Sequence, residues 1–208
     1  MPDIADPGVS DTPEEWPVAS SIDLHRDDWV VALRADRIRR PDHPEDEPFR
    51  RLVLEHPGAV VVLAVDDQDR VLCLRQYRHP VRRRFVELPA GLLDKDGEEP
   101  EEVARRELAE EAGLQATSWT HLISTYSSPG ICSELMHIFM ARGLSPADEG
   151  SLGDFVPEHE EADMELLWVP FVDLHAAVDS GDVQDGPLVI AVLLARTRGL
   201  AGPTLVRD

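Results

Sequence analysis

The sequence has 208 residues, of which 42% are hydrophobic and 29% charged, a composition typical of a folded globular protein and not of a disordered or fibrous one. Its 41 Asp and Glu against 20 Lys and Arg give a formal net charge of -21, which argues against nucleic acid or an anionic membrane as a partner. The apolar runs are far shorter than the ~20 residues of a membrane-spanning helix. With only two cysteines, Cys73 and Cys132, the chain suits a reducing compartment, and we expect a cytoplasmic protein.

The composition of the N-terminal quarter predicts two segments, a tail and a small subdomain. Residues 1–17 are rich in Asp, Glu and Pro and lack the basic and apolar regions of a signal peptide, so we expect a flexible acidic tail. Residues 18–55 predict a small antiparallel β subdomain. Its strands are expected at 29–38 and 49–56, on either side of the Pro- and Asp-rich loop RPDHPEDEP.

A larger domain is expected from residue 56 to residue 200. It begins with a continuous β-branched run at 58–66, typical of a buried strand, and an alternating strand at 70–78, which together predict a hairpin. An apolar strand and glycine turn, FVELPAGLL, precede an acidic helical segment. Further strands are expected at 118–126, 136–144 and 164–170, and further helices at 171–181 and 187–199. This order predicts an α/β or α+β sandwich.

The acidic segment GEEPEEVARRELAEEAGL predicts a helix of about three to four turns. Pro100 suits its first turn and Gly113 suits a left-handed C-cap. At about 100° per residue, three carboxylates share one arc of the helix surface. They belong to Glu107, Glu110 and Glu111.

Two interpretations of this acidic face are open. In a chain of net charge -21 it could be a solvated surface. Alternatively it is a metal site, because neighbouring like charges destabilise a helix by roughly 0.2–0.5 kcal/mol per pair unless a cation lies on them. Carboxylate oxygens are the ligands that Mg²⁺ and Mn²⁺ prefer.

The surrounding spacing resembles the signature of the Nudix hydrolases. Glu98 is followed, after seven residues, by REL, one further residue, EE, another residue, and then Gly-Leu, which matches each fixed position from the first glutamate onward. One departure precedes the helix: six residues separate Gly91 from Glu98, where the family has five. The inserted residue is expected to alter the shape of the loop and not the ligands.

This resemblance implies a Nudix-type α/β/α sandwich with a mixed sheet, preceded by the N-terminal antiparallel β subdomain. It also implies a bound Mg²⁺, or Mn²⁺, held by Glu107, Glu110, Glu111 and the backbone carbonyl of Ala90. Arg106 and Glu98 are expected to orient these ligands, with Gly91 and Gly113 as structural supports. The general base is expected in the loop HEEADM, where Glu161 is preferred over Glu160.

From about residue 56 to 190 the chain is similar to ADP-ribose pyrophosphatases. The segment YRHPVRRRFVELPAG resembles the strand and turn that precede the signature in those enzymes, and implies substrate binding by Arg78 and Glu87. Arg83 and Arg84 belong to the same basic cluster, which could contact phosphate or simply pair with acidic neighbours. A turn fifteen residues past Leu114 adds Pro129 and Gly130 to the expected binding residues.

The implied reaction is hydrolysis of ADP-ribose to AMP and ribose 5-phosphate by a homodimer, without nucleic acid or membrane partners. A Nudix enzyme acting on nucleotide sugars, NADH or other nucleoside diphosphate derivatives is the first alternative. A non-catalytic Nudix-fold sensor is the second. The intact glutamates of the helix favour an enzyme.

Overall fold

The computed structural model describes residues 8–95, 97–148 and 163–202. The chain divides into two compact units, residues 1–54 and 55–208. No helix among the described residues has the length and apolar character needed to cross a bilayer.

The first unit contains a three-stranded sheet of order β1-β2-β3, formed by Val18–His25, Ala32–Ile38 and Phe49–Glu55. Strands β1 and β2 run antiparallel. The sequence did not predict β1, because all eight of its residues are exposed and it has no buried face to give a pattern. Trp16, within the expected tail, lies edge-on to Phe49 with 6.3 Å between ring centroids.

The second unit contains two sheets. One has the order β10-β5-β6 and is antiparallel; the other has the order β7-β4-β9-β8 and is mixed, because β4 and β9 pair in parallel. The strands are β4 (Ala59–Ala64), β5 (Arg70–Arg78), β6 (Arg83–Glu87), β7 (Ala90–Leu92), β8 (Leu114–Tyr126), β9 (Leu135–Pro146) and β10 (Glu165–Pro170). The helices are α1 (Pro100–Ala112), α2 (Phe171–Asp179) and α3 (Gly186–Thr197), and a 3-10 turn spans His79–Val81.

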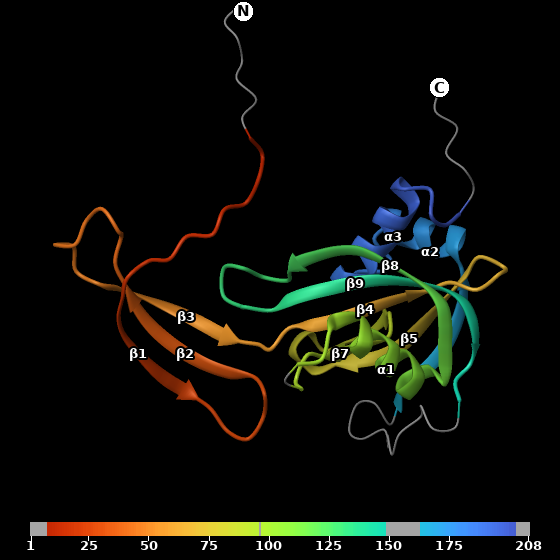
Figure 1. Ribbon diagram of the computed structural model, residues 1–208, viewed down its shortest axis with the longest axis horizontal. Coiled ribbons are helices and arrows are strands. Elements are labelled where there is room, and N and C mark those ends of the chain that lie inside the picture. Colours follow the sequence, from red (N-terminus) through yellow and green to blue (C-terminus); the bar gives the residue numbers. More distant parts are fainter. Residues whose placement is uncertain (1–7, 96, 149–162, 203–208) are drawn as a thin grey trace, which may run out of the picture. The chain divides into compact units, whose positions relative to one another are not determined.

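Strand β4 is buried along its whole length because helices cover both of its faces. Val61 and Leu63 pack in a core that includes side chains of α2 and α3. Val60 and Val62, which point the other way, pack in a second core with α1. Figure 1 shows α1 on one side of β4 and α2 and α3 on its other side. This is the sandwich with a mixed sheet that the resemblance implied.

Helix α1 has the ends that the sequence predicted. Pro100 occupies the first turn, and the Glu102 carboxylate accepts a hydrogen bond from the Glu99 backbone N–H at 3.3 Å in a capping box. The helix ends where Gly113 adopts a φ of 64°, a left-handed conformation that glycine takes without strain. Val103, Ala104 and Leu108 form its buried stripe, which leaves the neighbouring arc for carboxylates.

Candidate active site

Gly91 and Glu107 lie in direct contact. A Cβ atom built on Gly91 would lie 2.0 Å from Cδ and 2.2 Å from Oε1 of Glu107, so only glycine leaves room for this carboxylate. The contact joins β7 to α1 and leaves Glu107 only 9% exposed. The first glycine of the signature therefore serves to seat the first glutamate of the acidic helix face.

Ala90 contacts a second carboxylate of the helix. Its backbone N–H donates to Oε2 of Glu111 at 3.0 Å. Pro89 and Leu93 carry ladder hydrogen bonds with β4, at 2.8 and 3.1 Å. Since such bonds alternate along an antiparallel strand, both polar groups of Ala90 point away from β4. The Ala90 carbonyl therefore makes no hydrogen bond to β4.

Arg106 connects the carboxylates of this face. One of its terminal nitrogens lies 2.7 Å from Glu107 and 3.1 Å from Glu110, and the other lies 3.4 Å from Glu98. Its Nε is buried and has no hydrogen-bond partner among the described residues. The structure thus brings Glu98, Arg106, Glu107 and Glu110 together. Glu111 lies beside them, because it contacts Ala90, the residue next to Gly91.

The electrostatics of this cluster suit a cation. Burial raises the pKa of the Glu107 carboxyl to about 7; Arg106 opposes this rise, and Glu110 and Asp94 add to it. Arg106 alone therefore does not compensate the buried charge of Glu107. A divalent ion on these hard oxygen ligands would do so, and the residues present fit Mg²⁺ or Mn²⁺.

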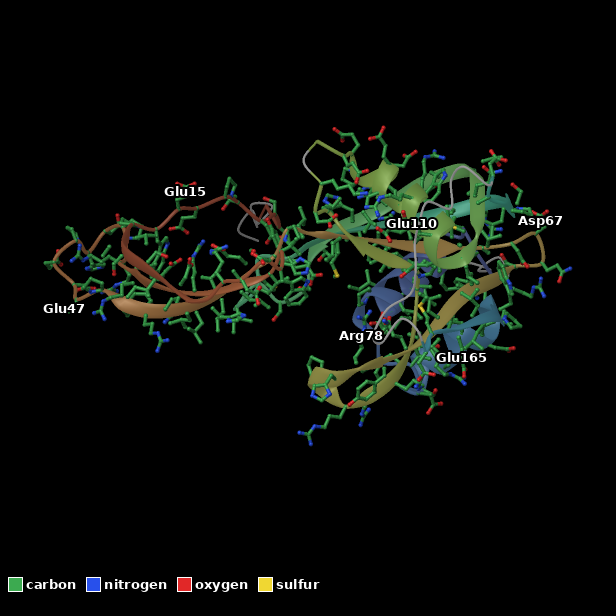
Figure 2. All side chains as sticks on the ribbon, turned by 90° about the horizontal axis from the view of Figure 1, so that it is seen from below. Glu15, Glu47, Asp67, Arg78, Glu110 and Glu165 are labelled. Carbon is green, nitrogen blue, oxygen red and sulfur yellow. The ribbon has the colours of Figure 1, made fainter. Side chains whose placement is uncertain are left out.

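An ion pair between the half-exposed Arg78 and the buried Glu87 lies close to this cluster. The Arg78 guanidinium donates to both carboxylate oxygens of Glu87, with distances of 2.9, 3.1 and 2.6 Å. The pKa of Arg78 is raised, chiefly by the hydrogen bonds to Glu87 and further by the charges of Asp185 and Glu111. Arg78 therefore lies within electrostatic range of the helix carboxylates. Figure 2 labels Arg78 together with Glu110 of α1.

Asp185 is a charged residue of this region that the sequence did not single out. Its carboxylate caps α3 by accepting from the Leu188 N–H at 2.9 Å. Burial raises its pKa to about 6; the Leu188 hydrogen bond opposes the rise, Glu87 adds to it and Arg78 opposes it. An acidic residue before Gly-Pro is a helix-start signal, but sequence alone does not reveal its proximity to Glu87.

The remaining expected residues have other surroundings. Arg83 donates to Gln184 at 2.6 Å, and Arg84 pairs with Asp163. Pro129 and Gly130 lie in a turn in which the Ile131 N–H donates to the Ser128 carbonyl at 3.0 Å. The expected base, Glu161, and its alternative Glu160 lie outside the described residues.

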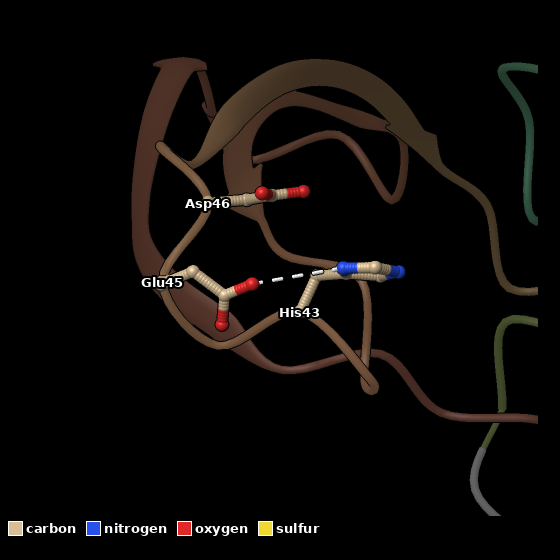
Figure 3. Close-up of side chains that lie close together, drawn as sticks. All are labelled: His43, Glu45 and Asp46. Carbon is tan, nitrogen blue, oxygen red and sulfur yellow. Dashed lines mark ion pairs between the residues drawn. The ribbon is translucent and has the colours of Figure 1, made fainter.

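A separate group of metal-ligating side chains lies in the first unit. Ligand atoms of His43, Glu45 and Asp46 are within 4.8 Å of one another (Figure 3). Asp46 is already paired with Arg40 at 2.5 Å, and Glu45 is 72% exposed. Exposed groups of this kind are common without an ion, so we assign no metal to them.

These features of the second unit agree with a family comparison. The NUDIX domain family matches residues 55–190. The chain therefore belongs to the Nudix family, as the spacing from Glu98 to Leu114 indicated.

Particular relatives are similar over most of the chain. An ADP-ribose pyrophosphatase of Mycobacterium tuberculosis (strain ATCC 25618 / H37Rv) is 39% identical over 176 residues, covering 84% of this chain and 81% of the relative. An ADP-ribose pyrophosphatase of Bacillus subtilis (strain 168) is 39% identical over 149 residues, covering 72% and 77%. A crystal structure of an ADP compounds hydrolase matches with a TM-score of 0.70 at 22% identity, over 92% of this chain and 98% of that chain, and supports the fold.

Proposed function

We propose that this chain hydrolyses the diphosphate of ADP-ribose to AMP and ribose 5-phosphate, with Mg²⁺ as cofactor and Mn²⁺ as a possible substitute. The observation that carries the proposal is the seating of Glu107 against Gly91 beside Glu110, Glu111 and Ala90. The named activity of the relatives at 39% identity supports the choice of substrate.

In the proposed site, Glu107, Glu110, Glu111 and the Ala90 carbonyl hold the ion. When bound, the ion draws charge from the diphosphate oxygens and lowers the pKa of a bound water. Arg106 keeps the carboxylates in place through its contacts with Glu107 and Glu110. Glu98 supports Arg106 from the other side.

For the substrate, we propose that Arg78 binds a diphosphate oxygen while Glu87 fixes the orientation of its guanidinium group. Arg78 is 49% exposed at its side chain, so it retains surface for an anionic ligand, whereas Glu87 is 8% exposed. Arg83, Arg84, Pro129 and Gly130 complete the proposed binding residues. Glu161 is the proposed general base, which takes a proton from the attacking water.

We also propose a homodimer, formed through the β subdomain of residues 18–55, and a cytoplasmic location. Strand β1 exposes the apolar side chains of Val18, Ile22 and Leu24. A second copy would cover these apolar side chains. Cys73 and Cys132 are both free thiols, which fits a reducing compartment.

A substrate panel tests the reaction. ADP-ribose, GDP-mannose, other nucleotide sugars and NADH are each incubated with the purified chain and Mg²⁺, and kcat/KM is compared. We expect ADP-ribose to be preferred at least about tenfold, a difference of about 1.4 kcal/mol in transition-state stabilisation. Preference for another diphosphate would overturn the assignment of ADP-ribose as the substrate. Failure to hydrolyse any of the compounds would overturn the proposal that the chain is an enzyme.

The metal ligands are tested by Glu111→Gln, with Glu101→Gln as the matched control on the same helix. The Gln side chain still accepts a hydrogen bond from Ala90, so the fold is expected to persist while Mg²⁺-dependent turnover falls by at least about 100-fold. Glu101 pairs with Arg105 on the exposed surface, and its change is expected to leave turnover within about twofold. Equal turnover in the two variants would remove Glu111 from the proposed ligands.

A further inference from the structure

Two histidines and a serine meet on the β8–β9 hairpin, in a row of the sheet that runs through Val60 of β4 to Gly91 of β7. Nε2 of His121 lies 2.9 Å from Oγ of Ser124, and Nδ1 of His137 lies 2.8 Å from the same oxygen. The two imidazole rings have centroids 6.4 Å apart. Two ring nitrogens from adjacent strands therefore converge on a single point.

An irregularity of β8 creates this convergence. In a regular strand, residues three positions apart point to opposite faces. The register of β8 shifts between His121 and Ile123, so that His121 lies opposite Phe139 and Ser124 lies opposite His137. Phe139 and His137 are two residues apart on β9 and share a face. His121 and Ser124 are thereby brought to that same face, and such irregularities often re-aim side chains near functional sites.

Packing of apolar side chains on the other face of the hairpin stabilises this irregular register. Leu122 is buried and Ile123 partly buried, and both pack in the core that includes α2 and α3. On the face that carries the two histidines, the His121 ring packs against the Phe139 ring, with 5.3 Å between their centroids. The packing on both sides holds the imidazoles in orientation before any ligand binds.

We propose that His121 and His137 form a binding site for a borderline divalent transition-metal ion, of the class of Cu²⁺, Ni²⁺ and Zn²⁺. Imidazole nitrogens suit these ions, whereas the oxygen ligands around Glu107 suit Mg²⁺. The ion would bind between the two ring nitrogens in place of their hydrogen bonds to Ser124, with the hydroxyl turned away. Metal–imidazole bonds are about 2.0–2.1 Å long, so both rings would close on the ion.

The protonation and charge of the surroundings favour such an ion. Burial lowers the pKa of His137, and the neighbouring His121 lowers it further, which favours the neutral ring that a metal requires. His121 is exposed and His137 partly exposed, so that an ion can enter from solvent. The net charge of -21 raises the local concentration of cations. The site does not depend on the proposed hydrolysis.

The test is Cu²⁺ binding to the untagged full chain, with excess Mg²⁺ present to occupy the carboxylate cluster. We expect one tightly bound Cu²⁺ whose electron paramagnetic resonance spectrum shows coupling to two imidazole nitrogens. His137→Gln and His121→Ala should each remove one nitrogen coupling and weaken binding at least about tenfold in competition with a chelator. Ser124→Ala should retain both couplings, because the hydroxyl is not the proposed ligand.

His43→Ala is the matched control, since it removes a histidine from the exposed group in the first unit. It should leave the spectrum and the affinity unchanged. Tight binding that persists in a His121→Ala, His137→Gln double variant would overturn the site. A wild-type spectrum with coupling to fewer than two imidazole nitrogens would overturn it as well.

Discussion

Glu107 differs from the other glutamates of its helix because it is buried against a glycine of strand β7. It is the carboxylate that lies on Gly91, and it is buried, whereas Glu102 in the first turn of the same helix is exposed. The spacing in the sequence predicted that Glu107, Glu110 and Glu111 share an arc. It could not predict which of them is buried, because burial depends on where β7 lies.

Substitution of Gly91 by alanine should displace Glu107. The added Cβ would lie 2.0 Å from Glu107 Cδ, so the carboxylate must leave its position. We expect kcat/KM to fall by at least about 100-fold, since a misplacement of about 1 Å suffices for such a loss. The overpacking should also lower the free energy of unfolding by about 1–3 kcal/mol. Steady-state kinetics and urea unfolding measure the two effects.

Gly186→Ala is the control for that change. A Cβ at Gly186 would meet no atom within 4 Å, and its backbone is not in the left-handed region. Its activity and stability should therefore stay close to those of the wild type. Wild-type activity in Gly91→Ala would show that the position of Glu107 is irrelevant to catalysis.

Arg106→Lys should weaken the binding of Mg²⁺ while the positive charge is retained. The guanidinium contacts Glu107, Glu110 and Glu98 with two different nitrogens, which a single ammonium group cannot reproduce. The Mg²⁺ concentration for half-maximal rate should rise about 10- to 100-fold, the range found when residues that orient metal ligands are changed. Titration of the rate with Mg²⁺ measures this.

The neighbouring Arg105→Lys provides the comparison. Arg105 pairs with Glu101 on the exposed surface and lies over the Trp119 ring, away from the carboxylate cluster. Its half-saturating Mg²⁺ concentration is expected to be unchanged. If the two variants responded alike, Arg106 would have no special role in positioning the ligands.

Among the elements, α3 depends on a partly buried carboxylate for its N-terminal cap. Asp185 accepts from Leu188, and its pKa is raised to about 6 from an ordinary value of 3.8. A carboxyl with a raised pKa in the folded state stabilises the fold most at low pH, and this contribution is lost as the pH rises through about 6. At neutral pH the ionised Asp185 therefore reduces the stability of the fold relative to a neutral cap.

Asp185→Asn should accordingly become more stable relative to the wild type as pH increases. Asparagine can cap the helix without ionising. Between pH 5 and 7.5 the difference in free energy of unfolding should move by about 1–2 kcal/mol in favour of the variant. Urea unfolding across this range measures the difference.

Asp185→Ala is the control for the cap itself. It removes the cap and should be less stable than Asp185→Asn by about 1 kcal/mol throughout. A pH-independent difference in stability between Asp185→Asn and the wild type would contradict the raised pKa.

The elements show where sequence patterns are informative. Helix α1 was predicted with both ends because Pro100 and Gly113 mark them, and β4 was predicted because a continuous β-branched run indicates burial on both faces. Strand β1 has no buried side chain, so its pattern gave no signal. The start of β8 was expected at residue 118, but its pairing with β9 begins at Leu114 opposite Pro146. Pairing between strands depends on the partner, which the local sequence does not contain.

At the scale of the whole molecule, the two units differ in how they bury their strands. The second unit has two cores around β4 and β9, while β1 of the first unit exposes Val18, Ile22 and Leu24 by 56%, 64% and 47%. Exposed apolar side chains concentrated on one strand make a surface suited to association. The sequence predicted the existence of this unit but not its exposed strand.

Ile22→Arg should therefore convert the proposed dimer into single chains. A charged side chain in place of Ile22 would be buried without a partner in the dimer. Sedimentation equilibrium should give the mass of two chains for the wild type and of one chain for the variant. Val9→Arg, at a 94% exposed position outside the sheet, should remain dimeric. A wild type that sediments as one chain would contradict the proposed dimer.

The parallel pairing of β4 with β9 has a consequence for the order of events during synthesis. Residues 59–64 pair with residues 136–141, so more than seventy residues must be made before β4 finds this neighbour. Gly91 and the glutamates of α1 leave the ribosome earlier, when the sheet beneath the helix is still open. The carboxylates then repel one another before β9 completes the sheet beside β4, and closure of such distant pairs is slow. Assembly of the carboxylate cluster is thus coupled to the arrival of a strand that contributes none of its carboxylates.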